Sequence, residues 1–340
     1  MSVPAFSDIA KAANDLLNKD FYHLSATTFE FKDTAPNGVA FKVTGKSSHE
    51  KATSAAIEGK YTDKPSGSAP RLRPPRRPVK GRGCSSPAVF VSGVLGPGTG
   101  WPLEFAAFFL PGFAQLLTWY TRTGLTLTQS WNTANALDTK IEVNDTLAKG
   151  LKLEGLFSFL PATAGKGAKF NLFFKQPGFH GRAFFDLLRG PVANVDAVVG
   201  HEGFLAGASA GYDVNKAALT AYSAAVGYAA PQYTAAVTAT DNLSVFAASY
   251  YHKVNSQVEA GAKATWNSKT GNTVGLEVAS KYRIDPVSFA KVKINDRGIA
   301  ALAYNVLLRE GVTLGLGGSF DTQKLDQATH KLGASFTFEG

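Results

Sequence analysis

The chain has 340 residues, of which 18% are charged and 34 are glycine, and Cys84 is its single cysteine. The charged fraction lies below the roughly 25% of ordinary soluble domains, and one cysteine excludes an intramolecular disulfide framework and a multi-cysteine metal site. The net charge of +9 comes largely from residues 68–124, which hold seven basic residues against one acid, so the rest of the chain lacks the basic excess of nucleic-acid-binding proteins.

The first 22 residues predict one short amphipathic helix. Its apolar and charged residues recur at helical spacing on different sides: Ile9, Ala13, Leu16 and Leu17 on one, Lys11, Asp15 and Lys19 on another. Ser7 is a candidate N-cap, and the same pattern equally fits a surface helix packed on a domain. The acids Asp8 and Asp15, and the lack of an apolar core, argue against a secretory signal or a typical mitochondrial presequence.

From about residue 25 the apolar period changes to two, which is typical of strands. In the final segment Leu332, Ala334, Phe336 and Phe338 alternate with polar or small residues. Nineteen such segments, separated mostly by turn-forming residues, are predicted near 25–33, 38–46, 51–61, 124–133, 137–144, 148–158, 167–175, 179–187, 192–200, 203–212, 217–227, 231–239, 243–251, 256–265, 273–282, 287–294, 298–307, 311–319 and 330–338.

Segments of about ten residues joined by short turns are typical of a transmembrane β-barrel. A soluble lectin-like sandwich is the main alternative, but its strands are usually shorter, about five or six residues. Nineteen up-and-down strands without a helical layer would also leave one sheet face with no core to pack on. Closing the sheet in lipid pairs every backbone group and leaves no edge.

Residues 68–124 interrupt the strand pattern. They hold 8 of the 16 prolines, and Glu104 and Pro111 break up the apolar patch Trp101–Tyr120, which argues against a spanning helix there. We interpret the stretch as a poorly ordered, Pro/Arg-rich insertion in the turn of the third hairpin. Its composition suggests translated non-coding sequence, such as a retained intron.

Over residues 1–67 and 125–340 the chain resembles the fungal mitochondrial porins, the voltage-dependent anion channels. The resemblance rests on these segments: Pro4-Ala5-Phe6-Ser7-Asp8-Ile9, Thr128-Gln129-Ser130-Trp131-Asn132-Thr133, Gly150-Leu151-Lys152, Gly200-His201-Glu202-Gly203-Phe204, and the run from Tyr251-His252-Lys253 to Tyr282-Arg283. It implies an all-β, nineteen-stranded transmembrane barrel whose first and last strands pair in parallel. Residues 1–22 would form a helix inside the pore, 23–67 strands one to three, and 125–340 strands four to nineteen.

The same resemblance implies a voltage-gated, weakly anion-selective channel of the mitochondrial outer membrane, with ATP, ADP and other small metabolites as permeants. It allows a homo-oligomer and the docking of cytosolic proteins. Lys331, Gly333, Phe336 and Phe338 look like the family's sorting signal for membrane insertion. Gln129 stands where animal relatives have a membrane-facing glutamate, so regulation through that acid is not expected here.

Strand parity predicts that Lys42, Lys152, Lys169 and Arg182 point into the lumen, with Lys11 and Lys19 added from the helix. Together these cations would favour anions, although any one of them alone is more often a solvated wall residue. Lys152 resembles the family's proposed nucleotide contact. Glu58, Glu154 and Asp186 share the inward face, which predicts modest selectivity.

An enzyme is not predicted, because no catalytic or metal-binding constellation is found. The six histidines are scattered, without a His-x-x-x-His or Glu-x-x-His motif. Val43-Thr44-Gly45-Lys46-Ser47 resembles the end of a phosphate loop, but Ala40 stands where that loop needs glycine. No cofactor, metal or nucleic-acid partner is expected.

Overall fold

The computed structural model describes residues 3–36, 38–50, 52–62, 125–145, 148–188, 190–271, 274–327 and 330–340. The predicted insertion 68–124 lies outside these residues and stays a prediction. The described chain begins with η1 (Phe6–Asp8), α1 (Lys11–Asn18) and η2 (Tyr22–Leu24) and continues as a single sheet of nineteen strands. No helix in these ranges is long and apolar enough to cross a membrane.

The strands, with the short helix η3 (Pro161–Thr163) between β6 and β7, have the following bounds: β1 (Thr27–Thr34), β2 (Val39–Ser47), β3 (Thr53–Thr62), β4 (Leu125–Asn132), β5 (Leu137–Asn144), β6 (Leu151–Leu160), β7 (Gly165–Gln176), β8 (Phe179–Asp186), β9 (Val192–His201), β10 (Phe204–Asp213), β11 (Ala218–Ala229), β12 (Tyr233–Thr240), β13 (Val245–Lys253), β14 (Val258–Asn267), β15 (Gly275–Asp285), β16 (Ser288–Asn295), β17 (Ile299–Arg309), β18 (Val312–Asp321) and β19 (Lys331–Glu339). The nineteen segments predicted from the sequence agree with these bounds to within three residues.

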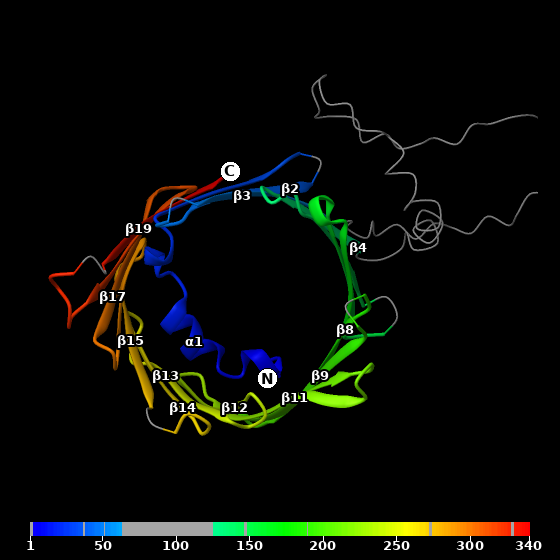
Figure 1. Cartoon of the computed structure of the whole chain (residues 1–340). Coiled ribbons are helices and arrows are strands. Elements are labelled where there is room, and N and C mark those ends of the chain that lie inside the picture. Colours follow the sequence, from blue (N-terminus) through cyan, green and yellow to red (C-terminus); the bar gives the residue numbers. More distant parts are fainter. Residues whose placement is uncertain are drawn as a thin grey trace, which may run out of the picture. The chain divides into compact units, whose positions relative to one another are not determined.

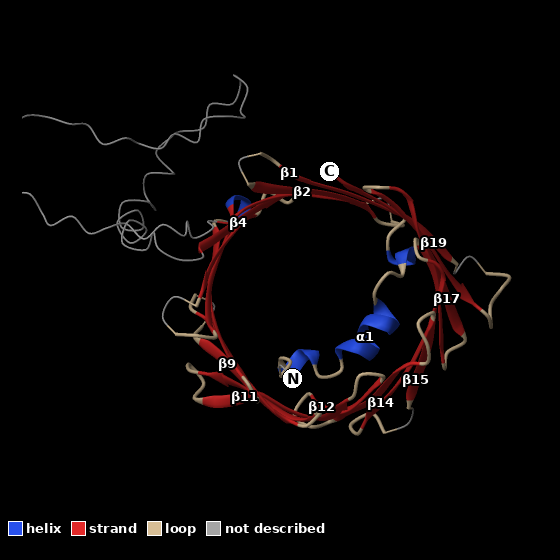
Figure 2. Cartoon of the chain, turned by 180° about the vertical axis from the view of Figure 1, so that it is seen from behind, coloured by secondary structure: helices blue, strands red, loops and turns tan. Residues whose placement is uncertain are grey.

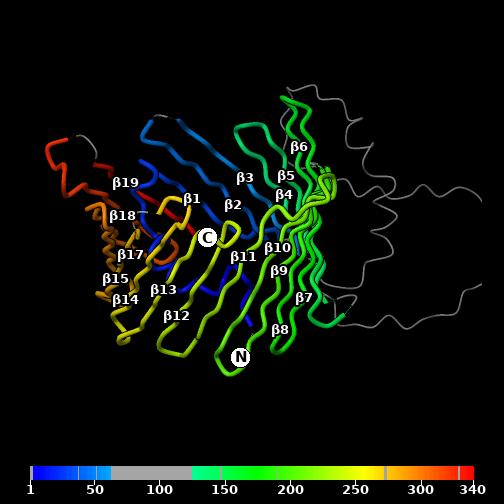
Figure 3. The backbone as a smooth tube through the Cα atoms, turned by 60° about the horizontal axis from the view of Figure 1, so that its bottom comes forward, coloured from blue at the N-terminus to red at the C-terminus, as the bar shows by residue number. Residues whose placement is uncertain are grey.

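The sheet closes on itself as a barrel, which Figure 1 shows end-on and Figure 3 from the side. Sequential strands pair antiparallel, whereas β1 pairs with β19 in parallel, from Thr27 opposite Ala334 to Lys32 opposite Glu339. An odd number of strands that alternate in direction leaves the first and last running the same way, so a parallel seam is the only way to close. Closure removes the unpaired edges that an open sheet would expose. The predicted nineteen-stranded barrel is confirmed.

The outer face of the barrel is apolar. In β1 the side chains of Phe29 and Phe31 are exposed, and in β4 those of Leu127 and Trp131. Aromatic rings contact one another on the outer face, where the ring centroids of Phe204 and Tyr228 lie 4.8 Å apart with tilted planes. An apolar band flanked by aromatic residues is how barrels meet a bilayer and its interface.

The N-terminal segment differs from the single helix predicted for residues 1–22. It forms three short pieces, and Ser7 is not a cap, because no side chain caps η1 or α1. The Ser7 hydroxyl instead accepts a hydrogen bond from Arg182 Nη1 on β8 at 3.2 Å. The prediction of an N-terminal amphipathic helix is confirmed for α1, whereas its extent over residues 1–22 and Ser7 as its cap were wrong.

This segment lies inside the barrel, along the inner wall (Figure 2). The predicted apolar side of the helix is the buried side. Three groups of N-terminal residues pack against small or branched wall residues: Val3, Ile9 and Ala10 on Val198, Leu205, Ala225 and Ala236; Leu16 and Leu17 on Ala279; Phe21 on Ala301 and Ala303. Contacts of α1 with β13, β14 and β15 and of η2 with β18 and β19 follow the same path.

Candidate functional site

The wall residues that touch the N-terminal segment define the lumen face of the sheet. Because directly opposed residues of paired strands share a face, the register extends this assignment round the barrel. The cations on that face are Lys32, Lys42, Lys46, Lys60, Lys140, Lys152, Lys169, Lys175, Arg182, Lys253, Lys263, Lys281, Arg283, Lys291, Lys293 and Lys331. The acids there are Glu30, Glu58, Asp138, Glu142, Glu154, Asp186, Asp196, Asp213, Glu259, Glu277, Asp321 and Glu339, so cations are in excess.

Four charged residues on β5 and β6 form one network on this face. Lys152 Nζ lies 2.7 Å from both Glu142 Oε1 and Glu154 Oε1, and Lys140 Nζ lies 2.9 Å from Glu142 and 3.4 Å from Glu154. Both carboxylates are largely buried, since their side chains are 11% and 8% exposed. The two positive and two negative charges offset each other, so Lys152 presents much less net charge to an ion than its sequence motif suggested.

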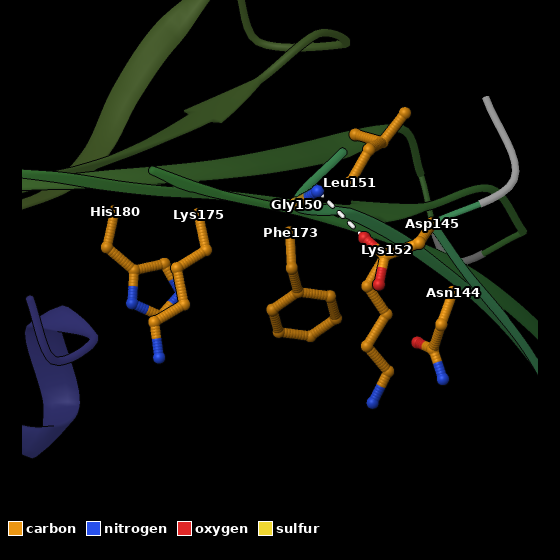
Figure 4. A pocket seen from close by; sticks show the side chains of 8 residues that line it. All are labelled: Asn144, Asp145, Gly150, Leu151, Lys152, Phe173, Lys175 and His180. Carbon is orange, nitrogen blue, oxygen red and sulfur yellow. Dashed lines mark hydrogen bonds between the residues drawn. The ribbon is translucent and has the colours of Figure 1, made fainter. Parts of the chain in front are cut away.

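Beside this network a hollow of about 440 Å³ opens, lined among others by Lys152, Phe173, Lys175 and His180. Figure 4 shows these side chains on the same side of the sheet, while Leu151 points to the other side. Lys152 Nζ lies 5.6 Å from the centre of the Phe173 ring. The hollow thus combines an aromatic face with cationic or titratable nitrogens, groups that interact with planar bases and with phosphates.

Asp145 and Gly150, which also line the hollow, belong to a tight turn before β6. Asp145 Oδ1 accepts a hydrogen bond from the Gly150 N–H at 2.7 Å, and Gly150 has a φ of +83°. A side chain at position 150 would overlap the carbonyl oxygen of Lys175. The backbone conformation and the close approach of Lys175 therefore require glycine at the first position of the Gly150-Leu151-Lys152 motif, independently of any ligand.

Two further predicted lumen cations have acidic neighbours. Lys42 Nζ lies 3.2 Å from Glu30 Oε1, close to Lys32, which bridges Glu30 at 3.0 Å and Glu339 at 2.8 Å. Lys169 Nζ lies 3.9 Å from Asp186 Oδ2, and its side chain is 59% exposed. Both face the lumen, and their role in permeation stays a prediction.

Arg182 has a more specific environment than the other predicted cations. Its guanidinium donates to both carboxylate oxygens of Asp196 at 2.9–3.1 Å, and both side chains are nearly buried. Its Nη1 also reaches Ser7 in the N-terminal segment. A bidentate, desolvated pair of this kind is held in place, so Arg182 anchors the segment in addition to any part in the anion pathway.

The predicted charges of the helix lie on its exposed side. Lys11, Asp15 and Lys19 are exposed, and Lys11 Nζ lies 3.8 Å from Asp8 Oδ1, a surface pair of small energetic weight. The segment thus places charges of both signs along the pathway.

The residues of the predicted sorting signal lie on both faces of β19. Lys331 and Gly333 face the lumen and Phe336 and Phe338 face outward, where the Phe338 ring lies 5.2 Å from that of Phe29. Their part in sorting stays a prediction. Gly333 has a further constraint, since a side chain there would overlap the carbonyl oxygens of Tyr22 and Ser25.

Sequence reasoning missed the wall residues that hold the N-terminal segment. Besides Arg182, these bonds come from His180 to the Val3 carbonyl, Lys263 to Asn14, Lys291 to the Asp15 and Lys19 carbonyls, and Asn305 to the Tyr22 hydroxyl. A polar side chain at an inward position, near inward glycines and alanines such as Gly261, Ala279 and Ala303, is the signal that could have found them. Within the described ranges no cluster of three potential metal ligands occurs.

A closed barrel with an apolar outside and a charged lumen defines the chain as a transmembrane pore-forming barrel. The eukaryotic porin family model matches residues 2–69 and 78–333. Over 339 residues, covering 100% of both chains, the sequence is 67% identical to "Mitochondrial outer membrane protein porin" of Neurospora crassa.

More distant relatives are named as voltage-gated ion channels. "Non-selective voltage-gated ion channel 1" of Saccharomyces cerevisiae is 35% identical over 342 residues, with 100% of both chains covered. "Non-selective voltage-gated ion channel VDAC1" of Homo sapiens is 34% identical over 221 residues, 65% of this chain and 77% of that one. The chain belongs to the eukaryotic porin family, and the predicted resemblance to mitochondrial porins is confirmed.

Proposed function

We propose that the chain is a voltage-gated, weakly anion-selective diffusion channel of the mitochondrial outer membrane that passes ATP, ADP and other small metabolites and ions. The observation that carries the proposal is the lumen itself, a barrel interior lined by charged side chains with an excess of cations. A passive channel needs no catalytic group, only a passage whose field favours one sign of charge.

The pairing of lumen charges explains why the selectivity should be weak. Lys140, Lys152 and Arg182 each face a carboxylate at close range, so much of their field is cancelled. Several other lumen cations form no ion pair with a described residue and would supply most of the anion preference: Lys46, Lys60, Lys175, Lys253, Lys281, Arg283 and Lys331.

The hollow at Lys152, Phe173, Lys175 and His180 supports nucleotides as permeants. The ammonium group of Lys175, which forms no ion pair with a described residue, can attract a phosphate, and the Phe173 ring offers a face for a base. The hollow is not enclosed, which suits brief contact during passage rather than tight binding.

The proposal is tested by refolding the purified chain and recording current across a planar lipid bilayer. We expect large, weakly anion-selective steps that close at higher voltage of either sign. Absence of conductance from a protein whose circular dichroism shows an intact sheet would refute the channel function.

Reversing the charges at Lys19, Lys152 and Lys169 to glutamate should move the reversal potential toward cation selectivity. A single change, Lys169→Glu, has a matched control in Lys166→Glu, which alters charge by the same amount on the same strand but on the outer face. Only the change at Lys169 should affect selectivity, and equal effects would mean that these side chains do not shape the lumen field.

A further inference from the structure

Lys291 on β16 is a buried cation that the permeation pathway does not use. Its side chain is only 2% exposed, although its neighbours across the sheet, Lys281 and Ala303, face the lumen like Lys291 itself. A buried ammonium group is costly unless charged or polar partners surround it, so its partners indicate what it does.

The hydrogen bonds, ion pair and ring contact of Lys291 are made with the end of α1 and the turn that follows it. Its Nζ donates to the backbone carbonyls of Lys19 at 2.6 Å and Asp15 at 3.3 Å. The Asp20 carboxylate lies 3.7 Å away, and the centre of the Phe21 ring lies 5.1 Å away. One wall side chain therefore contacts four residues of a segment some 270 positions earlier in the sequence.

The end of α1 is a place that needs such a contact. The last carbonyls of a helix have no partner within the helix and carry its negative partial charge, and no basic residue occupies the last turn of α1. The chain then turns through Asp20 with a φ of +62°, a left-handed conformation that usually falls to glycine at this position. The helix sequence thus supplies no basic residue in its last turn and no glycine after its C-cap Lys19.

We propose that Lys291 is a positioning residue that caps the C-terminus of α1 from the barrel wall and so fixes where the N-terminal segment ends and turns inside the pore. The inference concerns the placement of the segment and stands whether or not the chain conducts as proposed above. The Lys291 ammonium donates to the Asp15 and Lys19 carbonyls, faces the Asp20 carboxylate and lies over the Phe21 ring, so three successive features of the turn contact one side chain.

The neighbouring Lys281 provides a matched control. It lies directly opposite Lys291 in the register of β15 and β16, and its Nζ lies 4.3 Å from the centre of the Phe289 ring on the wall. Among the described residues it makes no contact with the N-terminal segment that would position it. Lys291→Met and Lys281→Met each remove one cation from directly opposed positions, and only Lys291 contacts the N-terminal segment, so a difference in segment placement separates the two variants.

The test uses a cysteine reporter on the buried side of the helix. In a full-length protein with Cys84→Ser, Leu17→Cys places a thiol at a position that is 0% exposed. A water-soluble, membrane-impermeant maleimide then measures how often the segment leaves the wall. We expect Lys291→Met to raise the labelling rate at least ten-fold over the reporter protein alone, and Lys281→Met to leave it within about two-fold.

Two further variants keep the result interpretable. Lys291→Arg retains a cation that can donate to carbonyls and should restore most of the protection. Asp20→Asn removes the opposing charge from the helix side while retaining a residue that tolerates a positive φ, and it should raise labelling by a smaller factor. Intact circular dichroism in every variant shows that the barrel is formed.

Equal labelling rates in Lys291→Met and Lys281→Met would overturn the proposal. So would an Lys291→Arg protein that labels as fast as Lys291→Met, since that would show a packing effect without a role for the charge. A selectivity change shared by both methionine variants, without a labelling difference, would assign Lys291 to the lumen field instead.

Discussion

The two halves of the inner wall differ in what their inward positions carry. Where the N-terminal segment covers the wall, from β8 to β19, many inward residues are glycine or alanine, as at Gly207, Ala225 and Ala279. Where the wall is open, from β1 to β7, the inward positions carry charged networks such as Lys140, Glu142, Lys152 and Glu154. The alternation along each strand is the same in both halves.

The residue type at an inward position of this barrel depends on what that position faces. Against another apolar segment, small residues let the backbone come close and bury area. Against water, charged residues are stabilised by solvent and by each other, and they set the field for ions. The covered wall therefore holds the segment, whereas lumen cations on both parts of the wall contribute to the field for ions. The following experiments test this difference.

The largest effect is expected where the covered wall leaves no room. At Gly317 on β18 a methyl group would lie 2.8 Å from the Tyr22 nitrogen and 2.9 Å from that of His23. Gly317→Ala should therefore displace η2 at a cost of about 1–3 kcal/mol. In a Cys84→Ser background, labelling of Phe21→Cys, a position 6% exposed in the native segment, should rise by roughly ten-fold or more.

Gly59→Ala on β3 is the matched control for this change. Gly59 faces outward, and an added methyl group would meet only the Phe41 ring at 3.9 Å. Labelling at Phe21→Cys should stay unchanged in this variant. If Gly59→Ala released the segment as strongly as Gly317→Ala, loss of strand glycines in general, and not close approach, would be the cause.

A smaller effect is expected on the open wall. Glu142→Gln with Glu154→Gln removes both carboxylates that neutralise Lys140 and Lys152 and should raise anion preference. A unit charge acts on an ion about 10 Å away in water with about 0.4 kcal/mol before screening, so the permeability ratio should change roughly two- to four-fold once salt is included. The reversal potential in a salt gradient measures it, and the accessibility of Leu17→Cys should stay constant. A shift toward cations would contradict this assignment.

The smallest effect concerns pH and the turn after the helix. Burial, together with Lys293, Lys331 and His49, lowers the pKa of His23 in η2. The docked segment therefore favours neutral His23, so this contribution to docking is complete above the ordinary pKa of about 6.5 and is lost as pH falls below it. Labelling of Phe21→Cys should rise modestly between pH 7.5 and pH 5, corrected for thiolate content. His23→Gln should abolish that rise, and a rise that persists would point to another titrating group.

Much of the barrel could be predicted from the sequence because alternation is a local signal. In β19 the outward set Leu332, Ala334, Phe336 and Phe338 is visible in nine residues, and it is the set that faces outward in the barrel. The inward direction of Lys42 and Lys152 follows from the same parity. What parity could not give is the pairing of those charges, since the partners of Lys152 come from two strands whose register is set by the whole sheet.

The N-terminal segment marks the limit of local reasoning. Its apolar side, with Ile9, Leu16 and Leu17, was correctly identified from helical spacing. Its division into three pieces and the true role of Ser7 were not, because Arg182, a residue 175 positions away, decides where the Ser7 hydroxyl is bound. A local capping hydrogen bond from Ser7 is expected only when the segment is free in water, away from Arg182.

The sequence by itself determined that the chain alternates over nineteen segments, with an apolar face and a polar face, and an odd number of alternating strands dictates a parallel seam on closure. The tertiary structure alone decided which cations are neutralised, which glycines make room for the segment, and that Lys291 contacts the end of α1. Side-chain direction depends on neighbours in the chain, whereas charge pairing and close approach depend on residues that meet only after the sheet has closed.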